Sequence, residues 1–286
     1  MATPRKGASI ELDDVGLRVG PEGSEVEILR STSLRVAAGE FVCLLGPSGS
    51  GKSTILNLVA GLAPPTSGRV LEGERPVSGP GPDRAVVFQD AALFPWLRLR
   101  DNIEFPLKLQ GVERAVRAAR SEELLRLVHL WRFRGCYPHE LSGGMRQRGA
   151  IARALAADPC VLLMDEPFAA LDSQTREILQ GELERIWSAT GKTVLFVTHN
   201  VWEAVRLADR VVLMATRPGR ILHEQTIDLP RPRAATDENV GVLVAGIARR
   251  IAHEVEKVAR EEADDAWVAP RTGRGDDPRW DMGGGI

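Results

Sequence analysis

The sequence has few cysteines and no long apolar run. Its 286 residues include three cysteines, Cys43, Cys136 and Cys160, which lie far apart. Without a CxxC pair or a neighbouring pair of histidines, they form no recognisable metal site and fit a reducing compartment. No stretch reaches the roughly 18–20 apolar residues of a membrane-spanning helix, and the N-terminus lacks the apolar region of a signal peptide. We therefore expect a chain that stays in the cytosol.

A large excess of charge is also missing. The net charge is -2, with 27% charged residues, which gives no global argument for a nucleic-acid partner. The hydrophobic content of 43% is ordinary for a soluble globular protein. A chain of this length can form one large α/β domain, or a domain with an appendage, around a core of ample size.

The spacing of apolar residues predicts the order of helices and strands. Residues 9–45 alternate apolar and polar positions and end in the apolar run 41–45, which indicates antiparallel strands followed by a buried strand. The remaining elements are predicted as follows: a helix from Lys52 to Gly61, mainly helical structure over 91–157, strands at 161–164, 193–198 and 210–214, and helices at about 172–189 and 201–208. Alternation of strand and helix after residue 160 indicates a parallel sheet, into which 91–157 is inserted.

A glycine-rich segment, GPSGSGKST, follows the buried strand and precedes the first helix. It satisfies the G-x-x-x-x-G-K-[ST] pattern, whose backbone N–H groups and helix N-terminus receive phosphates. Lys52 supplies a full positive charge to the β- and γ-phosphates, and the Ser53 hydroxyl is a ligand for Mg²⁺. The predicted nucleotide-binding residues are Gly46, Pro47, Ser48, Gly49, Ser50, Gly51, Lys52, Ser53 and Thr54. This loop by itself predicts only a P-loop NTPase.

Two carboxylates, Asp165 and Glu166, end the apolar strand at 161–164. In a P-loop fold the end of this strand lies beside the phosphate loop. Asp165 can then hold Mg²⁺ through water, while Glu166 faces the γ-phosphate and polarises the attacking water.

Residues 141–148, LSGGMRQR, come about twenty positions before Asp165, and here the sequence resembles the ATP-binding-cassette (ABC) family. Ser142, Gly143 and Gly144 cap a helix that we expect to start near Met145, which gives a second anion-receptive helix N-terminus. Within an inserted helical region these residues cannot reach the phosphate loop of their own chain. The resemblance implies that two domains pair head to tail, so that each signature closes on the γ-phosphate held by the partner.

The resemblance, which covers about residues 9–233, assigns roles to further residues. Gln89 resembles the Q-loop glutamine, a catalytic and Mg²⁺-contacting position, and His199 resembles the switch histidine that bridges the γ-phosphate and Glu166. Ala170, Leu171 and Asp172 resemble the D-loop, which places Asp172 at the nucleotide. The segments FQDAALFPW at 88–96 and DLPRPR at 228–233 are most similar to the importer ATPases for nitrate, sulfonate and taurine.

Two positions depart from the family pattern. Residues 1–40 contain no Phe, Tyr, Trp or His, so Val19 stands where many members stack an aromatic ring on adenine. Since stacking is worth about 1–3 kcal/mol per base, we expect weak base selectivity, with Val19 or the stem of Arg18 against the ring. Met145 replaces a common glutamine, a change of little expected effect because Ser142 and the backbone contact the phosphate.

The predicted fold is an α/β P-loop NTPase of the ABC type, with a parallel-sheet core, an N-terminal antiparallel β-subdomain and an inserted α-helical subdomain. Its expected divisions are an N-terminal tail (1–8), the ATPase domain (9–233, with the helical subdomain at about 91–157), a C-terminal helix (234–263) and a disordered tail (264–286). The periodic apolar residues after 240 support the helix, and the Gly, Pro and charge content of 264–286 supports the tail.

The predicted function is the MgATP-hydrolysing subunit of an importer for a small solute. Its expected partners are a second ATPase copy, a transmembrane permease at the cytoplasmic face of the membrane and, indirectly, a solute-binding protein, with no nucleic acid. The segment 94–96, Phe-Pro-Trp, is either core or the permease contact. Two alternatives remain, namely the ATPase of an exporter or lipid-trafficking complex, and a soluble ABC protein that acts on nucleic acid or ribosomes.

Overall fold

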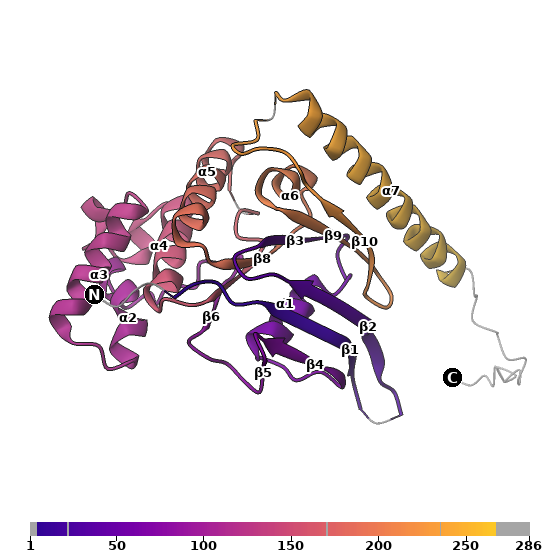
Figure 1. Ribbon diagram of the computed structural model, residues 1–286, viewed down its shortest axis with the longest axis horizontal. Coiled ribbons are helices and arrows are strands. Elements are labelled where there is room, and N and C mark those ends of the chain that lie inside the picture. The colour runs from indigo at the N-terminus through magenta and orange to yellow at the C-terminus, as the bar shows by residue number, and fades with distance from the viewer. Residues whose placement is uncertain (1–4, 22, 170, 235, 267–286) are drawn as a thin grey trace, which may run out of the picture.

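The computed structural model of the protein describes residues 5–21, 23–169, 171–234 and 236–266. Two β-sheets form its centre, with three helices to one side and one long helix to the other (Figure 1). In the described residues no helix is both long enough and apolar enough to cross a membrane.

The larger sheet has six strands and carries most of the buried apolar chain. Its spatial order is β10 (Arg220–Thr226), β9 (Arg210–Ala215), β3 (Phe41–Leu45), β8 (Thr193–Thr198), β7 (Val161–Asp165) and β6 (Arg84–Val87). Strands β9 to β6 are parallel, and β10 is an antiparallel edge strand. The carboxyl ends of the parallel strands therefore meet at one edge of the sheet, which is where ligands bind in such folds.

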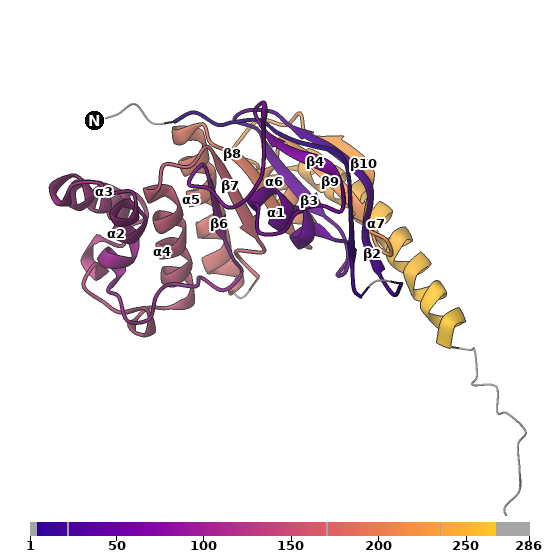
Figure 2. The same ribbon diagram turned by 90° about the horizontal axis from the view of Figure 1, so that it is seen from below.

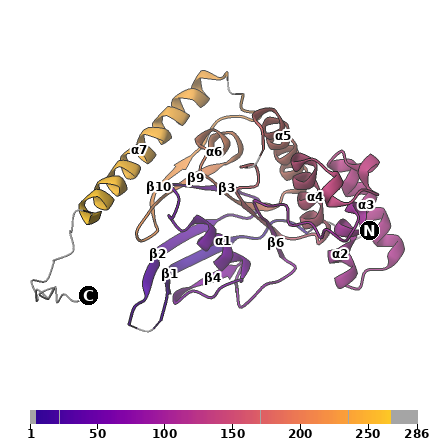
Figure 3. The ribbon, with the colours of Figure 1, turned by 180° about the vertical axis from the view of Figure 1, so that it is seen from behind.

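The smaller sheet is antiparallel and has the order β2 (Val26–Val36), β1 (Ile10–Val19), β4 (Ser67–Glu72) and β5 (Arg75–Pro76). Helix α1 (Lys52–Ala60) lies between the two sheets, as Figures 2 and 3 show. The first strands after residue 9 are antiparallel as predicted, and the predicted helix starts at Lys52.

Three helices form the region between β6 and β7: α2 (Leu99–Leu109), α3 (Arg114–Leu127) and α4 (Gly143–Ala156), with 3₁₀ turns at Trp131–Phe133 and Pro138–Glu140. They lie together beside the sheet (Figures 1 and 2). The prediction of helical structure from residue 91 was too early. Residues 91–98 form a loop, because the buried Asn102 amide binds the loop backbone at Phe94, Leu97 and Arg98.

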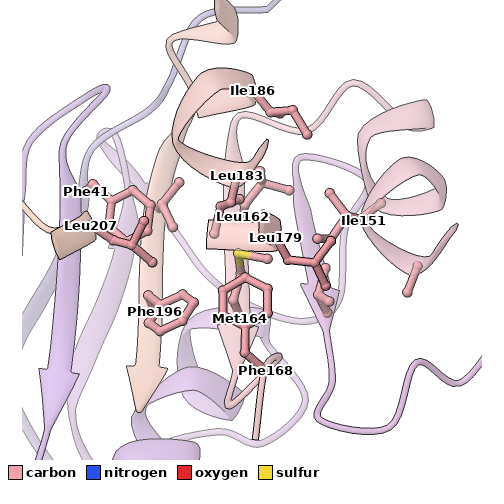
Figure 4. Packing of buried hydrophobic residues seen from close by; sticks show 14 of the residues in the cluster. Phe41, Ile151, Leu162, Met164, Phe168, Leu179, Leu183, Ile186, Phe196 and Leu207 are labelled. Atoms are coloured by element: carbon pink, nitrogen blue, oxygen red, sulfur yellow. The ribbon is translucent and has the colours of Figure 1, made fainter. Parts of the chain in front are cut away.

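Helices α5 (Ser173–Thr190) and α6 (Val201–Leu207) cover the other face of the larger sheet. Along β3 the side chains alternate between the two layers: Phe41, Cys43 and Leu45 join one cluster, and Val42 and Leu44 the other. Both faces of the sheet are therefore buried, which explains the continuous apolar run in the sequence. Figure 4 shows the first cluster, where Phe196 packs between Phe41 and Phe168 at ring-centroid distances of 5.8 Å.

The last described element is α7 (Glu238–Ala266), which crosses over α6 and runs past β10 (Figure 1). It buries Val240, Val244 and Ile247 against the first cluster. The helix begins four residues later than predicted and includes 264–266, which were assigned to a disordered tail. The rest of that predicted tail, 267–286, and residues 1–4 of the predicted N-terminal tail lie outside the described residues.

Residues 5–8 are hydrogen-bonded to the domain although they were expected to form a tail. The Arg5 N–H donates to Asp158 at 3.0 Å, and the buried Lys192 ammonium donates to both the Arg5 carbonyl and Asp158 at 2.6 Å. The Gly7 N–H donates to the Gly191 carbonyl at 3.1 Å. The N-terminal segment thus lies against the loop that follows α5.

Candidate active site

The glycine-rich loop lines a cavity of about 270 Å³ at the N-terminus of α1, together with Glu166. Gly49 and Gly51 have φ angles of 78° and 82°, a region that glycine adopts without strain. A Cβ on Gly51 would also lie 2.5 Å from the Leu29 side chain, so β2 packs directly on the loop. The backbone N–H groups at this helix start form an anion-binding site of the kind that the sequence predicts.

The side chain of Lys52 is buried within this loop and is 6% exposed as a whole residue. Its ammonium donates hydrogen bonds to the Gly46 and Pro47 carbonyls at 2.8 Å and to the Ser50 hydroxyl at 3.3 Å. Burial lowers the pKa of Lys52, and the nearby Glu166 and Asp165 carboxylates oppose that shift. A buried cation at the rim of an anion site is poised to exchange carbonyl partners for phosphate oxygens.

Ser53 and Asp165 come together across the sheet edge, where the Ser53 hydroxyl donates to Asp165 Oδ1 at 3.0 Å. Burial raises the pKa of Asp165, while the Ser53 hydrogen bond opposes the shift. A hydroxyl and a desolvated carboxylate are hard oxygen ligands that suit Mg²⁺, which binds through few protein ligands and keeps several waters. The residues present therefore fit the metal that the sequence predicts.

Glu166 and His199 lie at the ends of the neighbouring strands β7 and β8. His199 Nδ1 is 2.9 Å from Glu166 Oε2, and the Glu166 N–H donates to the Val197 carbonyl at 3.0 Å. Glu166 has a φ angle of 42°, which is strained for a residue with a side chain and typical of functional positions. The same carboxylate also lines the phosphate-loop cavity. It is thus held by the histidine while facing the site where phosphates bind.

The signature residues start α4 but do not line the phosphate-loop cavity. Ser142 is the N-cap, and its hydroxyl accepts a hydrogen bond from the Met145 N–H at 3.3 Å. The helix starts at Gly143 and not near Met145 as predicted, because the cap bond already encloses the two glycines. Gly143 lines a different hollow of about 370 Å³, together with Gln89. Neither residue lines the phosphate-loop cavity of its own chain.

Two further predicted residues occupy well-defined positions. Asp172 is the N-cap of α5, where its carboxylate accepts from the Thr175 N–H at 2.9 Å, a bond that lowers the pKa of Asp172. Val19 ends β1, is paired with Val26 and is 54% exposed. Ala170 of the predicted D-loop lies outside the described residues.

The segment that contains Phe94 and Trp96 is partly core and partly surface. Phe94 packs on Phe105 at 4.8 Å between ring centroids, whereas Trp96 is 70% exposed and stacks on Phe94 at 5.4 Å. Phe94 is thus packed within the helical region, whereas a permease contact at Trp96 stays a prediction. No sequence pattern singled out Asn102, which binds the backbone of this loop from α2.

A polar cluster next to His199 was also not predicted from the sequence. Glu203, on α6, is 5% exposed and accepts hydrogen bonds from Thr198 and Gln180. Arg176 of α5 lies 3.6 Å from the same carboxylate. These residues are spread over three elements, so only the folded chain brings them together.

Comparison with known proteins places these features in a family. The model of the family described as ABC transporter matches residues 29–169. The chain is 54% identical over 203 residues to the taurine import ATP-binding protein TauB of Burkholderia pseudomallei, covering 71% of this chain and 78% of that protein. It is 51% identical over 223 residues to the nitrate import ATP-binding protein NrtD of Synechocystis, covering 77% and 83%.

Solved structures give the same result. The dimeric post-hydrolysis state of the ATP-binding cassette MJ0796, bound to ADP and Pi, superposes with a TM-score of 0.69 at 34% identity. The match covers 77% of this chain and all of that one. The fold predicted from the sequence, a parallel P-loop core with an antiparallel sheet and a helical insertion, is thereby confirmed.

Proposed function

The chain belongs to the ABC transporter ATP-binding family, and we propose that Glu166 is the base with which it hydrolyses ATP in a pair of such chains. The protein is an ATP hydrolase that uses ATP and Mg²⁺. The observation that carries the assignment is the Glu166 carboxylate, which lines the phosphate-loop cavity and is held 2.9 Å from the His199 ring.

The proposed chemistry divides among groups that lie at one sheet edge. Backbone N–H groups of 46–54 and the Lys52 ammonium bind the phosphates and stabilise charge that develops on them. Ser53 and Asp165 would hold Mg²⁺, which when bound would neutralise charge on the phosphates. Glu166 accepts a proton from the attacking water, while His199 fixes the orientation of that carboxylate.

The site is completed by a second copy of the chain. Ser142, Gly143 and Gly144 of the partner would meet the γ-phosphate, with Asp172 at the nucleotide, while Gln89 would contact the Mg²⁺ held by Ser53 and Asp165. The separation of the Gly143 hollow from the phosphate-loop cavity supports this arrangement, as does the dimeric state of the related cassette MJ0796. A two-fold pair uses the same two surfaces on each chain, so it contains two such sites.

The transport role follows from the relatives. TauB and NrtD are named as import ATP-binding proteins, and we infer that this chain also energises import of a small solute such as nitrate, a sulfonate or taurine. It would act at the cytoplasmic face of the membrane on a separate permease, which receives solute from a binding protein. The exposed Trp96 offers a contact for the permease.

The base assignment is tested with Glu166→Gln. This variant keeps the size of the side chain but cannot accept the proton, so it should bind MgATP, accumulate a stable pair and turn over at a rate indistinguishable from background. Gel filtration with and without MgATP, together with phosphate release, measures both effects. Hydrolysis at the wild-type rate by this variant would refute the assigned base.

The import role is tested separately by purifying the chain together with its permease and reconstituting the complex into liposomes. Solute and loaded binding protein on the outside should stimulate ATP hydrolysis and drive solute inward. Outward transport, or stimulation by lipid in place of solute, would identify an exporter or lipid-trafficking complex.

A further inference from the structure

Glu203 is a buried carboxylate that the proposed mechanism does not use. It is 5% exposed, yet three polar side chains converge on it. Thr198 donates its hydroxyl at 2.6 Å, Gln180 its amide at 3.2 Å, and the Arg176 guanidinium lies at 3.6 Å. Burial raises the pKa of Glu203, and these partners oppose the shift. Burying a carboxylate is costly unless it is paired, so the arrangement suggests a specific role.

One side of this cluster reaches the backbone on both sides of His199. The Thr198 hydroxyl that donates to Glu203 also accepts from the Asn200 N–H at 3.0 Å. Asn200 in turn caps α6, where its side-chain oxygen accepts from the N–H groups of Trp202 and Glu203. The histidine therefore sits between two residues whose positions depend on Glu203.

The other side reaches the segment that follows the proposed base. Arg176 donates to the Phe168 carbonyl at 3.3 Å and to the Leu171 carbonyl at 2.8 Å. Phe168 and Leu171 lie between Glu166 and Asp172 in the sequence, and Leu171 and Asp172 are expected to meet the partner chain in the proposed pair. The guanidinium of Arg176 holds its N–H groups in a fixed planar fork, so it can bind both carbonyls and face the carboxylate at once.

The two sides enclose a common cavity. It measures about 30 Å³, enough for a water molecule. Its walls are Glu166, Ala169, Arg176, Thr198, His199, Asn200 and Glu203. The buried cluster thus lies directly behind the pair formed by Glu166 and His199.

We propose that Glu203 and Arg176 form a brace that positions His199 and links it to Phe168 and Leu171. Both are positioning residues, since neither lines the phosphate-loop cavity. The inference rests on the proposed function, because it assigns the brace to the same base and switch histidine. In a pair of chains, displacement of Phe168 and Leu171 on pairing would be passed through Arg176 and Glu203 to His199, so hydrolysis would depend on correct pairing.

The test uses the full-length chain and compares Glu203→Ala with a matched control, Glu184→Ala. Glu184 is also buried and on the adjacent α5, but it pairs with Arg231, away from His199. Because small misplacements of catalytic groups cost up to about 100-fold, we expect Glu203→Ala to lower kcat by about 10- to 100-fold. The KM for ATP should stay within about twofold, since the phosphate-loop contacts are intact.

The control should lose thermal stability to a similar degree while keeping its kcat. A merely structural role for Glu203 predicts that both variants lose activity only in proportion to their unfolding, and that result would overturn the proposal. If Glu203→Ala does not fold, Arg176→Lys takes its place, because lysine keeps the charge and loses the two-carbonyl contact.

A double variant identifies the route through the histidine. Once His199→Ala has removed the positioned group, adding Glu203→Ala should lower kcat by less than about twofold, whereas independent effects multiply. Full multiplication would overturn the brace. Wild-type turnover by His199→Ala alone would instead refute the role given to His199 in the proposed function, so the two failures are distinguishable.

Discussion

Replacing Ser142 with aspartate separates the two roles that this side chain has in the proposed pair. In the single chain Ser142 caps α4, where its hydroxyl accepts from the Met145 N–H at 3.3 Å. Aspartate is an equally good N-cap, so the folded chain without nucleotide should keep its stability. In the closed pair, however, the new carboxylate would face the γ-phosphate held by the partner.

The cost of that contact can be calculated. Two unit negative charges 4 Å apart repel by about 4 kcal/mol at the effective dielectric of 20 that suits protein surfaces. Since 1.36 kcal/mol is a factor of ten in rate, kcat/KM for ATP should fall by about 1,000-fold.

Ser142→Ala is the matched control, because it should lower the stability of the chain more than Ser142→Asp does but its activity less. It loses the cap, at about 1 kcal/mol of stability, but adds no repulsion. Its loss of a hydrogen bond to a charged group, about 1.5–3 kcal/mol, gives a smaller activity defect of about 10- to 150-fold.

Urea unfolding and steady-state phosphate release measure the two quantities. Wild-type hydrolysis by Ser142→Asp would refute the reasoning, because the signature would then have no contact with phosphate. Severe destabilisation of the nucleotide-free variant would refute the capping argument.

Three more predictions concern the nucleobase, the metal site and the fold. Val19→Tyr should strengthen ATP binding by about 1–3 kcal/mol through stacking on adenine, as measured by competition with a fluorescent nucleotide. The wild type should hydrolyse ATP and GTP at similar rates, and a strong preference for ATP would contradict weak nucleobase selectivity. Because burial raises the pKa of Asp165, its ionised form costs stability at neutral pH, so Asp165→Asn should stabilise the chain in urea unfolding at pH 7.5. That gain should shrink as the pH falls through the raised pKa of Asp165 and vanish below 3.8, the ordinary value, where the carboxyl is protonated in both states; a pH-independent effect would contradict the assignment. Arg233→Met should lower the free energy of unfolding by about 3 kcal/mol or more, because buried carbonyls lose the hydrogen bonds that Arg233 donates. These carbonyls include those of Val205, Ala208 and Ile227. An unchanged melting temperature in calorimetry would contradict this prediction.

The candidate site residues that the structure brings together belong to local sequence patterns. The glycine-rich loop, the strand that ends at Asp165 and the helix that begins at Lys52 are contiguous patterns. Their meeting at one sheet edge follows from the rule that parallel strands end together. The bond between Ser53 and Asp165, 112 positions apart, is a direct consequence of that rule.

The parts that the sequence missed have weak or non-local signals. Strand β10 reads RILHEQT, an edge strand with no clear apolar alternation, so it gave little strand signal. Helix α2 lies within the predicted helical region, but it contains Pro106, so the apolar pattern did not define its bounds. The Glu203 cluster forms only where α5, α6 and β8 are in contact, and no residue spacing in the sequence predicts that contact.

The most direct test of the composite site is a mixture of two inactive chains. Lys52→Met disables the phosphate loop, and Ser142→Asp disables the signature. In an equimolar mixture half of the pairs combine the two variants, and each such pair has one intact site. If sites act independently, the two-fold arrangement predicts that about a quarter of the wild-type ATPase activity returns. A mixture as inactive as the separate variants would contradict the shared site. It would indicate that each site lies within one chain, since such a site is inactivated in both variants and mixing cannot restore it.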